Sequence, residues 1–257
     1  MSINIIFTLK NIQNMIYFTN GDYMKENKYI TNNYKLIIKS IFIYLLFWNS
    51  KYFQYIPAII LKIANINITN KSAYAAFLST FSEIIYFIII IFIYKKELKE
   101  DFIKFKNNFL NYIDTGFKSW FIGLLIMFVS NLILAYVFKS GGAKNENLVQ
   151  EIIHAAPIIM ALDICIFGPF NEEIAFRKTF KDIIKNRWLF ILSSFIIFGG
   201  AHVYSNAKNI IDWLYIIPYG ALGAALAKAC YDTDNIFTSI FFHAFHNTAM
   251  FIISVII

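Results

Sequence analysis

Residues 73–94 form a long, mostly apolar segment in which Glu83 is the only charged residue. A helix needs roughly 20 consecutive apolar residues to cross the hydrocarbon core of a bilayer, so this segment alone predicts a membrane span. The composition agrees, because 58% of the residues are hydrophobic and 15% are charged, whereas a soluble domain carries about 25% charged residues. The sequence therefore predicts an integral membrane protein.

Segments of the same kind recur along the chain and predict an all-α, polytopic membrane helix bundle. We expect about seven transmembrane helices, with six or eight as alternatives, and the first is either one ragged span or a span plus an interfacial piece. The expected spans are residues 36–61, 73–94, 120–138, 157–181, 188–203, 213–229 and 236–257. Residues 95–118 are expected to form a charged connector, and residues 148–156 an interfacial segment.

Three parts follow from this pattern. They are an N-terminal cytoplasmic segment (1–35, with Met24 as an alternative start), the leading helices with the charged connector (36–147) and a C-terminal core (148–257). Lysine and arginine concentrate in residues 95–118 and 178–187, and cytoplasmic loops carry such an excess. We therefore expect these segments and the N-terminus in the cytoplasm. The net charge of +7 is explained by these flanks, and no nucleic-acid partner is expected.

Two adjacent glutamates, Glu172 and Glu173, lie in the predicted span that begins at residue 157. Ionisable groups at a helix centre cost roughly 2.5–3.5 kcal/mol each on insertion scales, so a functional role is expected. Neighbouring helical residues point about 100° apart, whereas Glu173 and Arg177 share a face in the favoured acid-first order. An ion pair between these two would leave Glu172 free to act as a general base. The alternative is that both glutamates cap the helix after Pro169, favoured by the helix dipole.

A histidine is expected opposite these glutamates. The predicted helices that carry Glu172 and His202 are antiparallel and meet at a turn midway between these two residues. Each residue lies roughly 22 Å from that turn at the rise of a helix, so both should lie at the same depth in the bundle. Phe198 lies one turn from His202 and can wall a pocket. Gly199 and Gly200 are expected to allow close approach of neighbouring helices.

The last predicted span adds further polar groups. His243 and Asn247 are four residues apart and share a helix face, with His246 at its edge. A lone histidine on an apolar helix is usually a core residue, but a glutamate, two histidines and an asparagine that can converge indicate a site. Asp163 and Glu83 also lie within spans, where each lines the same cavity or pairs with a lysine or a polar neighbour.

These residues form three ordered motifs in about residues 155–257. They resemble the motifs of the CPBP intramembrane proteases, the Abi or CAAX-protease group related to the type II CAAX prenyl endopeptidase. The motifs are Glu172-Glu173-xxx-Arg177, Phe198-xxx-His202 and His243-xxx-Asn247. One departure is Lys178, which stands where the family commonly has glycine and which bears on local packing rather than on chemistry.

The resemblance implies a role for each motif residue. Glu172 with His202 would activate a water molecule, while His243 and Asn247 would stabilise the oxyanion, an interaction worth several kcal/mol. The residues implied to support them are Glu173, Arg177 and Phe198. No cofactor is favoured. Zn²⁺ would be held by Glu172, His202 and His243, but the sequence has no His-Glu-x-x-His helix and asparagine is a poor zinc ligand, so a metal-free hydrolysis is favoured.

The resemblance also implies a function, namely an intramembrane endopeptidase that cleaves a membrane-associated peptide precursor or a lipidated C-terminus. Bacterial relatives are linked to bacteriocin self-immunity. The small size and a residue usage typical of AT-rich coding fit a bacterial cytoplasmic membrane. Two alternatives stay open: a non-catalytic immunity or scaffold protein on the same fold, and a transporter that uses the buried acids and histidines as a proton path.

Overall fold

The structure of the protein is a computed structural model that describes residues 20–140 and 144–256, with side chains from residue 34 and again from residue 149. Every regular element in these ranges is helical, as predicted. Most of the predicted N-terminal segment, residues 1–19, lies outside the described residues.

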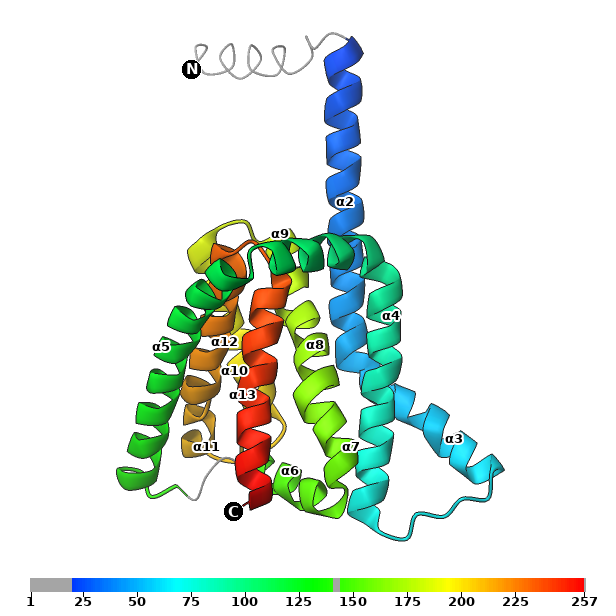
Figure 1. The fold of residues 1–257 in the computed structure, drawn as a ribbon, viewed down its shortest axis with the longest axis vertical. Coiled ribbons are helices and arrows are strands. Elements are labelled where there is room, and N and C mark those ends of the chain that lie inside the picture. Colours follow the sequence, from blue (N-terminus) through cyan, green and yellow to red (C-terminus); the bar gives the residue numbers. More distant parts are fainter. Residues whose placement is uncertain (1–19, 141–143, 257) are drawn as a thin grey trace, which may run out of the picture.

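The elements follow one another as a bundle with short connections (Figure 1). The α-helices are α2 (Asn20–Asn49), α3 (Tyr55–Ile63), α4 (Lys71–Asn107), α5 (Phe109–Tyr136), α6 (Lys144–Ala155), α7 (Pro157–Leu162), α8 (Gly168–Glu173), α9 (Thr179–Ile183), α10 (Arg187–Tyr204), α11 (Ile210–Leu214), α12 (Ile216–Asp232) and α13 (Ile236–Ile256). A 3-10 turn, η1 (Ser50–Gln54), and two π-helical turns, η2 (Asp163–Phe167) and η3 (Ile174–Lys178), complete the described elements.

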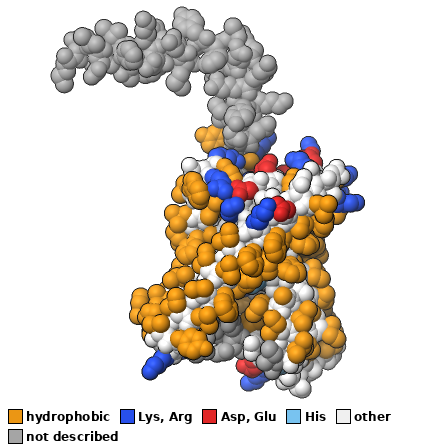
Figure 2. Space-filling model, turned by 60° about the vertical axis from the view of Figure 1, so that its left-hand side comes forward, with side chains coloured by type: hydrophobic (Ala, Val, Ile, Leu, Met, Phe, Trp, Pro, Cys, Tyr) orange, Lys and Arg blue, Asp and Glu red, His pale blue; other side chains and the backbone are white. Residues whose placement is uncertain are grey.

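Five segments are long and apolar enough to cross a membrane. They are Lys71–Asn107, Phe109–Tyr136, Arg187–Tyr204, Ile210–Asp232 and Ile236–Ile256. Many large apolar side chains on them face outward, among them Phe92 at 84% exposure and Ile88 at 60%, and Figure 2 shows apolar side chains covering the flank of the bundle. Exposed apolar surface of this extent is the surface that lipid solvates, so the chain is an integral membrane protein.

The predicted span that starts at Pro157 is a composite helix made of α7, η2, α8, η3 and α9. It runs through the depth of the bundle beside α13 (Figure 1). Two π-helical turns divide it into short pieces, so it is not among the five segments that are long and apolar enough to cross a membrane. Helix α2 is not among them either. The prediction of about seven spans had counted both.

Two predicted boundaries differ in the structure. Residues 36–61 are the end of α2 plus a separate piece, because η1 breaks the helix after α2 and α3 projects away from the bundle (Figure 1). Residues 95–118 are not a separate connector. Helix α4 continues to Asn107, its last turns bend across one end of the bundle, and α5 begins at Phe109.

Charged residues gather at the end where α4 bends over. Figure 2 shows lysines and acids clustered there above the apolar belt. Lys39 pairs with Glu97, and Arg187 pairs with Asp232 at 2.9 Å. The two lysine-rich segments thus lie at the same end, as the expected orientation requires. That this end faces the cytoplasm stays a prediction from the charge rule.

Helix α12 lies at the centre and packs most closely against α10 and α5. Small residues allow this close packing. A Cβ atom added at Gly199 would lie 2.7 Å from the backbone oxygen of Ile216 and 2.9 Å from the nitrogen of Gly220, whereas one at Gly200 would meet nothing within 4 Å. The expectation of close approach is therefore confirmed for Gly199 and wrong for Gly200, which faces open space.

We expect Gly199→Ala to lower the free energy of unfolding by about 1–3 kcal/mol, because its methyl group overlaps the backbone of α12. Gly200→Ala is the matched control. It should leave stability unchanged or raise it by up to about 1 kcal/mol, since alanine is the better helix former. Thermal unfolding of both variants in one detergent measures the difference, and equal midpoints would contradict the close contact.

Candidate functional site

The centre of the candidate site is a buried ion pair between Glu173 and Arg177. Arg177 Nη1 lies 3.0 Å from Glu173 Oε1, and both side chains have 0% exposure. Arg177 Nη2 also donates a hydrogen bond to the backbone oxygen of Gly223 at 3.2 Å, and the guanidinium lies 4.3 Å from the ring centroid of Phe198. The pair has the spacing from which it was predicted, and it ties the composite helix to α12 and α10.

His243 lies between the two glutamates. Its Nδ1 is 2.8 Å from Glu173 Oε1, and its Nε2 is 3.8 Å from Glu172 Oε2. A carboxylate accepts hydrogen bonds, so Nδ1 is the donor in the first contact. The adjacent glutamates therefore approach opposite nitrogens of one imidazole. Their spacing on the helix indicated that they point apart, but it did not indicate that they share a partner.

His202 occupies a neighbouring position. Its Nδ1 lies 2.9 Å from the backbone oxygen of Phe198, and its ring stacks on Tyr219 with centroids 4.8 Å apart. No hydrogen bond or ion pair joins Glu172 to His202 in the described part of the chain. Instead, the ring of Phe198 contacts both imidazoles, with its centroid 4.4 Å from that of His202 and 5.7 Å from that of His243.

The amide of Asn247 connects α13 to the first π-helical turn. Asn247 Nδ2 donates to the backbone oxygen of Ile164 at 3.2 Å, which leaves its second amide hydrogen free of this bond. Hydrogen bonding in a π-helical turn departs from the regular helical pattern, and such turns are frequent at functional sites. His246 is buried on another side of α13, with its ring centroid 6.4 Å from that of Trp120.

A second polar cluster lies between α4 and the composite helix. Asn171 Nδ2 donates to the backbone oxygen of Glu83 at 2.9 Å and to its Oε2 at 2.6 Å. Asp163 accepts from the hydroxyls of Ser79 at 3.2 Å and Thr80 at 3.4 Å. Of the alternatives for Glu83 and Asp163, polar neighbours rather than lysines are their partners. Asn171 was not among the predicted residues, although an amide directly before the glutamate pair was a signal for it.

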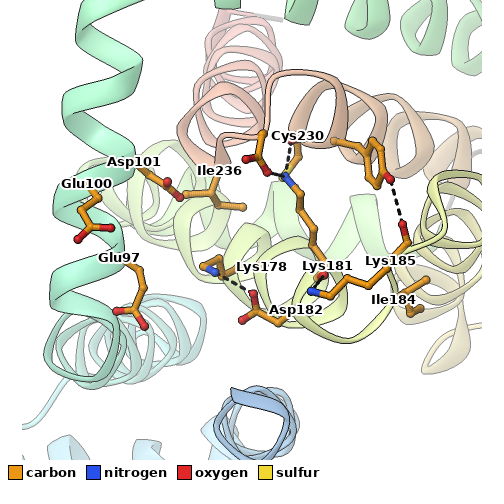
Figure 3. Close-up of a pocket in the computed structure, with 12 residues that line it drawn as sticks. Glu97, Glu100, Asp101, Lys178, Lys181, Asp182, Ile184, Lys185, Cys230 and Ile236 are labelled. Atoms are coloured by element: carbon orange, nitrogen blue, oxygen red, sulfur yellow. Dashed lines mark hydrogen bonds and ion pairs between the residues drawn. The ribbon is translucent and has the colours of Figure 1, made fainter. Parts of the chain in front are cut away.

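A recess of about 520 Å³ opens at the charged end of the bundle, apart from the cluster of Glu173, His243 and Glu172 (Figure 3). Its walls carry charges from α4 and α9, which include Asp101 and Lys181. Lys181 Nζ donates hydrogen bonds to Asp234 Oδ1 at 2.6 Å and to the backbone oxygen of Cys230 at 3.1 Å. The predicted catalytic residues do not line this recess.

The donor set expected for zinc does not fit a metal ion in this arrangement. Within residues 20–140 and 144–256, no group of three or more His, Cys, Asp or Glu side chains is placed to hold one. The second nitrogen of His243 faces Glu172, whereas no ion pair joins His202 to either glutamate among the described residues. We therefore derive no step through a metal ion.

A family comparison concerns the same part of the chain. Residues 154–249 match the family described as type II CAAX prenyl endopeptidase Rce1-like, and this stretch contains the whole predicted site. The chain is also 30% identical over 133 residues to the Bacillus subtilis (strain 168) protein named "Putative membrane peptidase YdiL", an alignment of 50% of this chain and 51% of that protein. The chain thus aligns with about half the length of this relative. No solved structure matches.

Removing one partner of the buried ion pair should unfold the protein more readily. We expect Arg177→Met to cost about 3–5 kcal/mol, because it leaves the Glu173 carboxylate buried without its cation. The matched control is Lys118→Met, which removes an ion pair of the same spacing with Asp114 whose side chains are 69% and 63% exposed. That change should cost no more than about 0.5 kcal/mol. Thermal unfolding in detergent measures both, and equal shifts would contradict the buried pair's role.

Proposed function

We propose that this chain, a member of the CAAX-protease-like family through residues 154–249, is an intramembrane endopeptidase. The observation that carries the proposal is the position of Glu172. Its Oε2 is buried without a hydrogen-bond partner among the described residues and lies 3.8 Å from the imidazole Nε2 of His243. That imidazole is held in turn by Glu173, whose charge is balanced by Arg177.

The proposed reaction is the addition of water to a peptide carbonyl. Glu172 accepts a proton as the water oxygen bonds to the carbonyl carbon, and it returns a proton to the amine as the C–N bond breaks. A carboxylate in this position supplies general acid–base catalysis, which is typically worth about 10²–10⁴-fold in rate. Its side chain is 26% exposed, so the carboxylate is partly accessible.

The two histidines are suited to different roles. His202 donates through Nδ1 to a backbone carbonyl, so its neutral ring keeps an acceptor at Nε2 that can orient the attacking water. His243 donates through Nδ1 to Glu173. When protonated, it has a second donor at Nε2, which with the remaining amide hydrogen of Asn247 can stabilise the developing oxyanion.

The proposed substrate is a membrane-associated peptide precursor or a lipidated C-terminus, because the site lies among membrane-spanning helices. The name of the Bacillus relative, "Putative membrane peptidase YdiL", supports the reaction class. We place the protein in a bacterial cytoplasmic membrane, with the charged end toward the cytoplasm. A role in bacteriocin self-immunity is the accompanying biological proposal.

Cleavage of lipid-anchored peptides in proteoliposomes tests the function. A peptide library with acyl or prenyl anchors is incubated with the wild type and with Glu172→Gln, and products are identified by mass spectrometry. We expect the substitution to reduce the rate by about 10²–10⁴-fold, since it removes the general base.

The matched control for this experiment is Glu100→Gln, which alters an exposed carboxylate of the recess in Figure 3. It should leave the rate unchanged. Equal cleavage by the wild type and Glu172→Gln would refute the proposed role. Bacteriocin resistance that survives Glu172→Gln would support the non-catalytic scaffold instead.

A further inference from the structure

Helix α8, which carries Glu172, is short and lies between two π-helical turns. It comprises only Gly168–Glu173, with η2 before it and η3 after it. Regular helical hydrogen bonding therefore changes on both sides of the proposed general base. The rotation of α8 about its own axis must then be determined by contacts with neighbouring helices.

Glu173 fixes one side of α8 through His243 and Arg177, and a second contact that limits this rotation is made by Asn171, the residue directly before Glu172. Asn171 has 0% exposure, and its amide nitrogen bonds to both the backbone oxygen and the carboxylate of Glu83 on α4. Within the described residues, Asn171 is the only hydrogen-bond donor to the Glu83 carboxylate. One amide nitrogen with two hydrogens and two acceptors on one residue permits a single orientation.

Helix α4 is itself held firmly at this level. The hydroxyl of Tyr86 donates to the backbone oxygen of Ile43 at 2.9 Å, and that of Ser82 donates to the backbone oxygen of Ser50 at 2.6 Å. Phe87, one turn beyond Glu83, packs against Phe170 of α8 with ring centroids 4.7 Å apart. Glu83 is therefore attached to a fixed support on one side and to α8 on the other.

Packing alone does not explain a carboxylate at this position. An ionisable side chain near the centre of a membrane helix carries a free-energy cost that an apolar residue would avoid. The aromatic contact of Phe87 already joins the two helices. What Glu83 adds is orientation. Its carboxylate accepts a hydrogen bond from Asn171, and this bond fixes the orientation of the backbone next to Glu172 rather than the distance between the helices.

We infer that Glu83 is a positioning residue, which acts through Asn171 to aim the Glu172 carboxylate at His243. The inference deepens the proposed peptidase function and rests on it. It adds a residue of α4, which lies outside the stretch 154–249 that matches the family.

The geometry indicates how large the effect is. Side-chain ends lie roughly 5–6 Å from a helix axis, so a rotation of α8 by about 20° moves the Glu172 carboxylate by about 2 Å. The carboxylate lies 3.8 Å from His243 Nε2 in the present orientation. Misplacement of a catalytic group by about 1 Å can cost about 10²-fold in rate, so loss of the Asn171 contact should be visible in kcat.

The test compares Glu83→Ala with Glu83→Gln in the proteoliposome cleavage assay. We expect Glu83→Ala to lower kcat by about 10–100-fold with little change in KM, because a positioning contact acts in the transition state rather than in substrate binding. Glu83→Gln should stay within about threefold of the wild type, since its amide oxygen still accepts from Asn171. Glu100→Ala is the control, because it removes an exposed carboxylate of α4 that lines the recess of Figure 3, and it should leave kcat unchanged.

A second variant identifies the route. If Glu83 acts through Asn171, the double variant Glu83→Ala/Asn171→Ala should be no slower than Asn171→Ala alone, because Asn171→Ala already removes the hydrogen bond to the Glu83 carboxylate. If the rate losses of the two single variants multiply in the double variant, Glu83 does not act through Asn171. A Glu83→Gln variant as slow as Glu83→Ala would also contradict this route. A change in the KM of Glu83→Ala alone, with kcat unchanged, would overturn the positioning role.

A substrate-independent measurement separates this inference from the proposed function. Dicyclohexylcarbodiimide labels carboxyl groups in apolar surroundings, and peptide mapping by mass spectrometry reports the label on Glu172. We expect its labelling rate to change by at least threefold in Glu83→Ala and to stay within twofold of the wild type in Glu83→Gln. If the wild type cleaves no peptide but this difference appears, the peptidase proposal fails while the positioning stands. Equal labelling in all three proteins would overturn the positioning.

Discussion

The buried ion pair of Glu173 and Arg177 is the interaction on which the arrangement of the core depends. Two charges with no exposed surface are costly to desolvate, and such a pair is tolerated only with good geometry and further partners. Here the partners come from three other helices: the backbone oxygen of Gly223, the ring of Phe198 and the imidazole of His243. Satisfying these two charges therefore brings α12, α10 and α13 to the composite helix.

This pair also determines the chemistry available to its neighbour. The same Glu173 oxygen that meets Arg177 accepts from His243 Nδ1, so the imidazole is oriented by a group that is itself immobilised. A carboxylate that orients one ring nitrogen decides which nitrogen is left for a reaction. The remaining nitrogen faces Glu172. Structural stability and the proposed catalytic orientation thus depend on one connected set of contacts, which accounts for charges kept inside a lipid-solvated bundle.

The sequence predicted the parts of this arrangement that follow from regular helical geometry. The four-residue spacing of Glu173 and Arg177 was sufficient for the ion pair, and long apolar segments were sufficient for the all-α fold. The partner of Glu172 could not be obtained in this way. Equal distance from a corner predicts a common depth with His202, but two π-helical turns alter the rotation of the helix, and His243 is the nearer imidazole.

Contacts between helices that are far apart in sequence could not be predicted from the sequence either. Glu83 and Asn171 are joined across two helices by hydrogen bonds that no spacing rule anticipates. Only the presence of each polar group in an apolar segment was a signal, and burial in lipid demands a partner without naming it. The same reasoning connects the leading half of the chain to the C-terminal core. A short helix bounded by two irregular turns depends on neighbouring continuous helices for its orientation, and α4 supplies such support to Asn171, directly before Glu172.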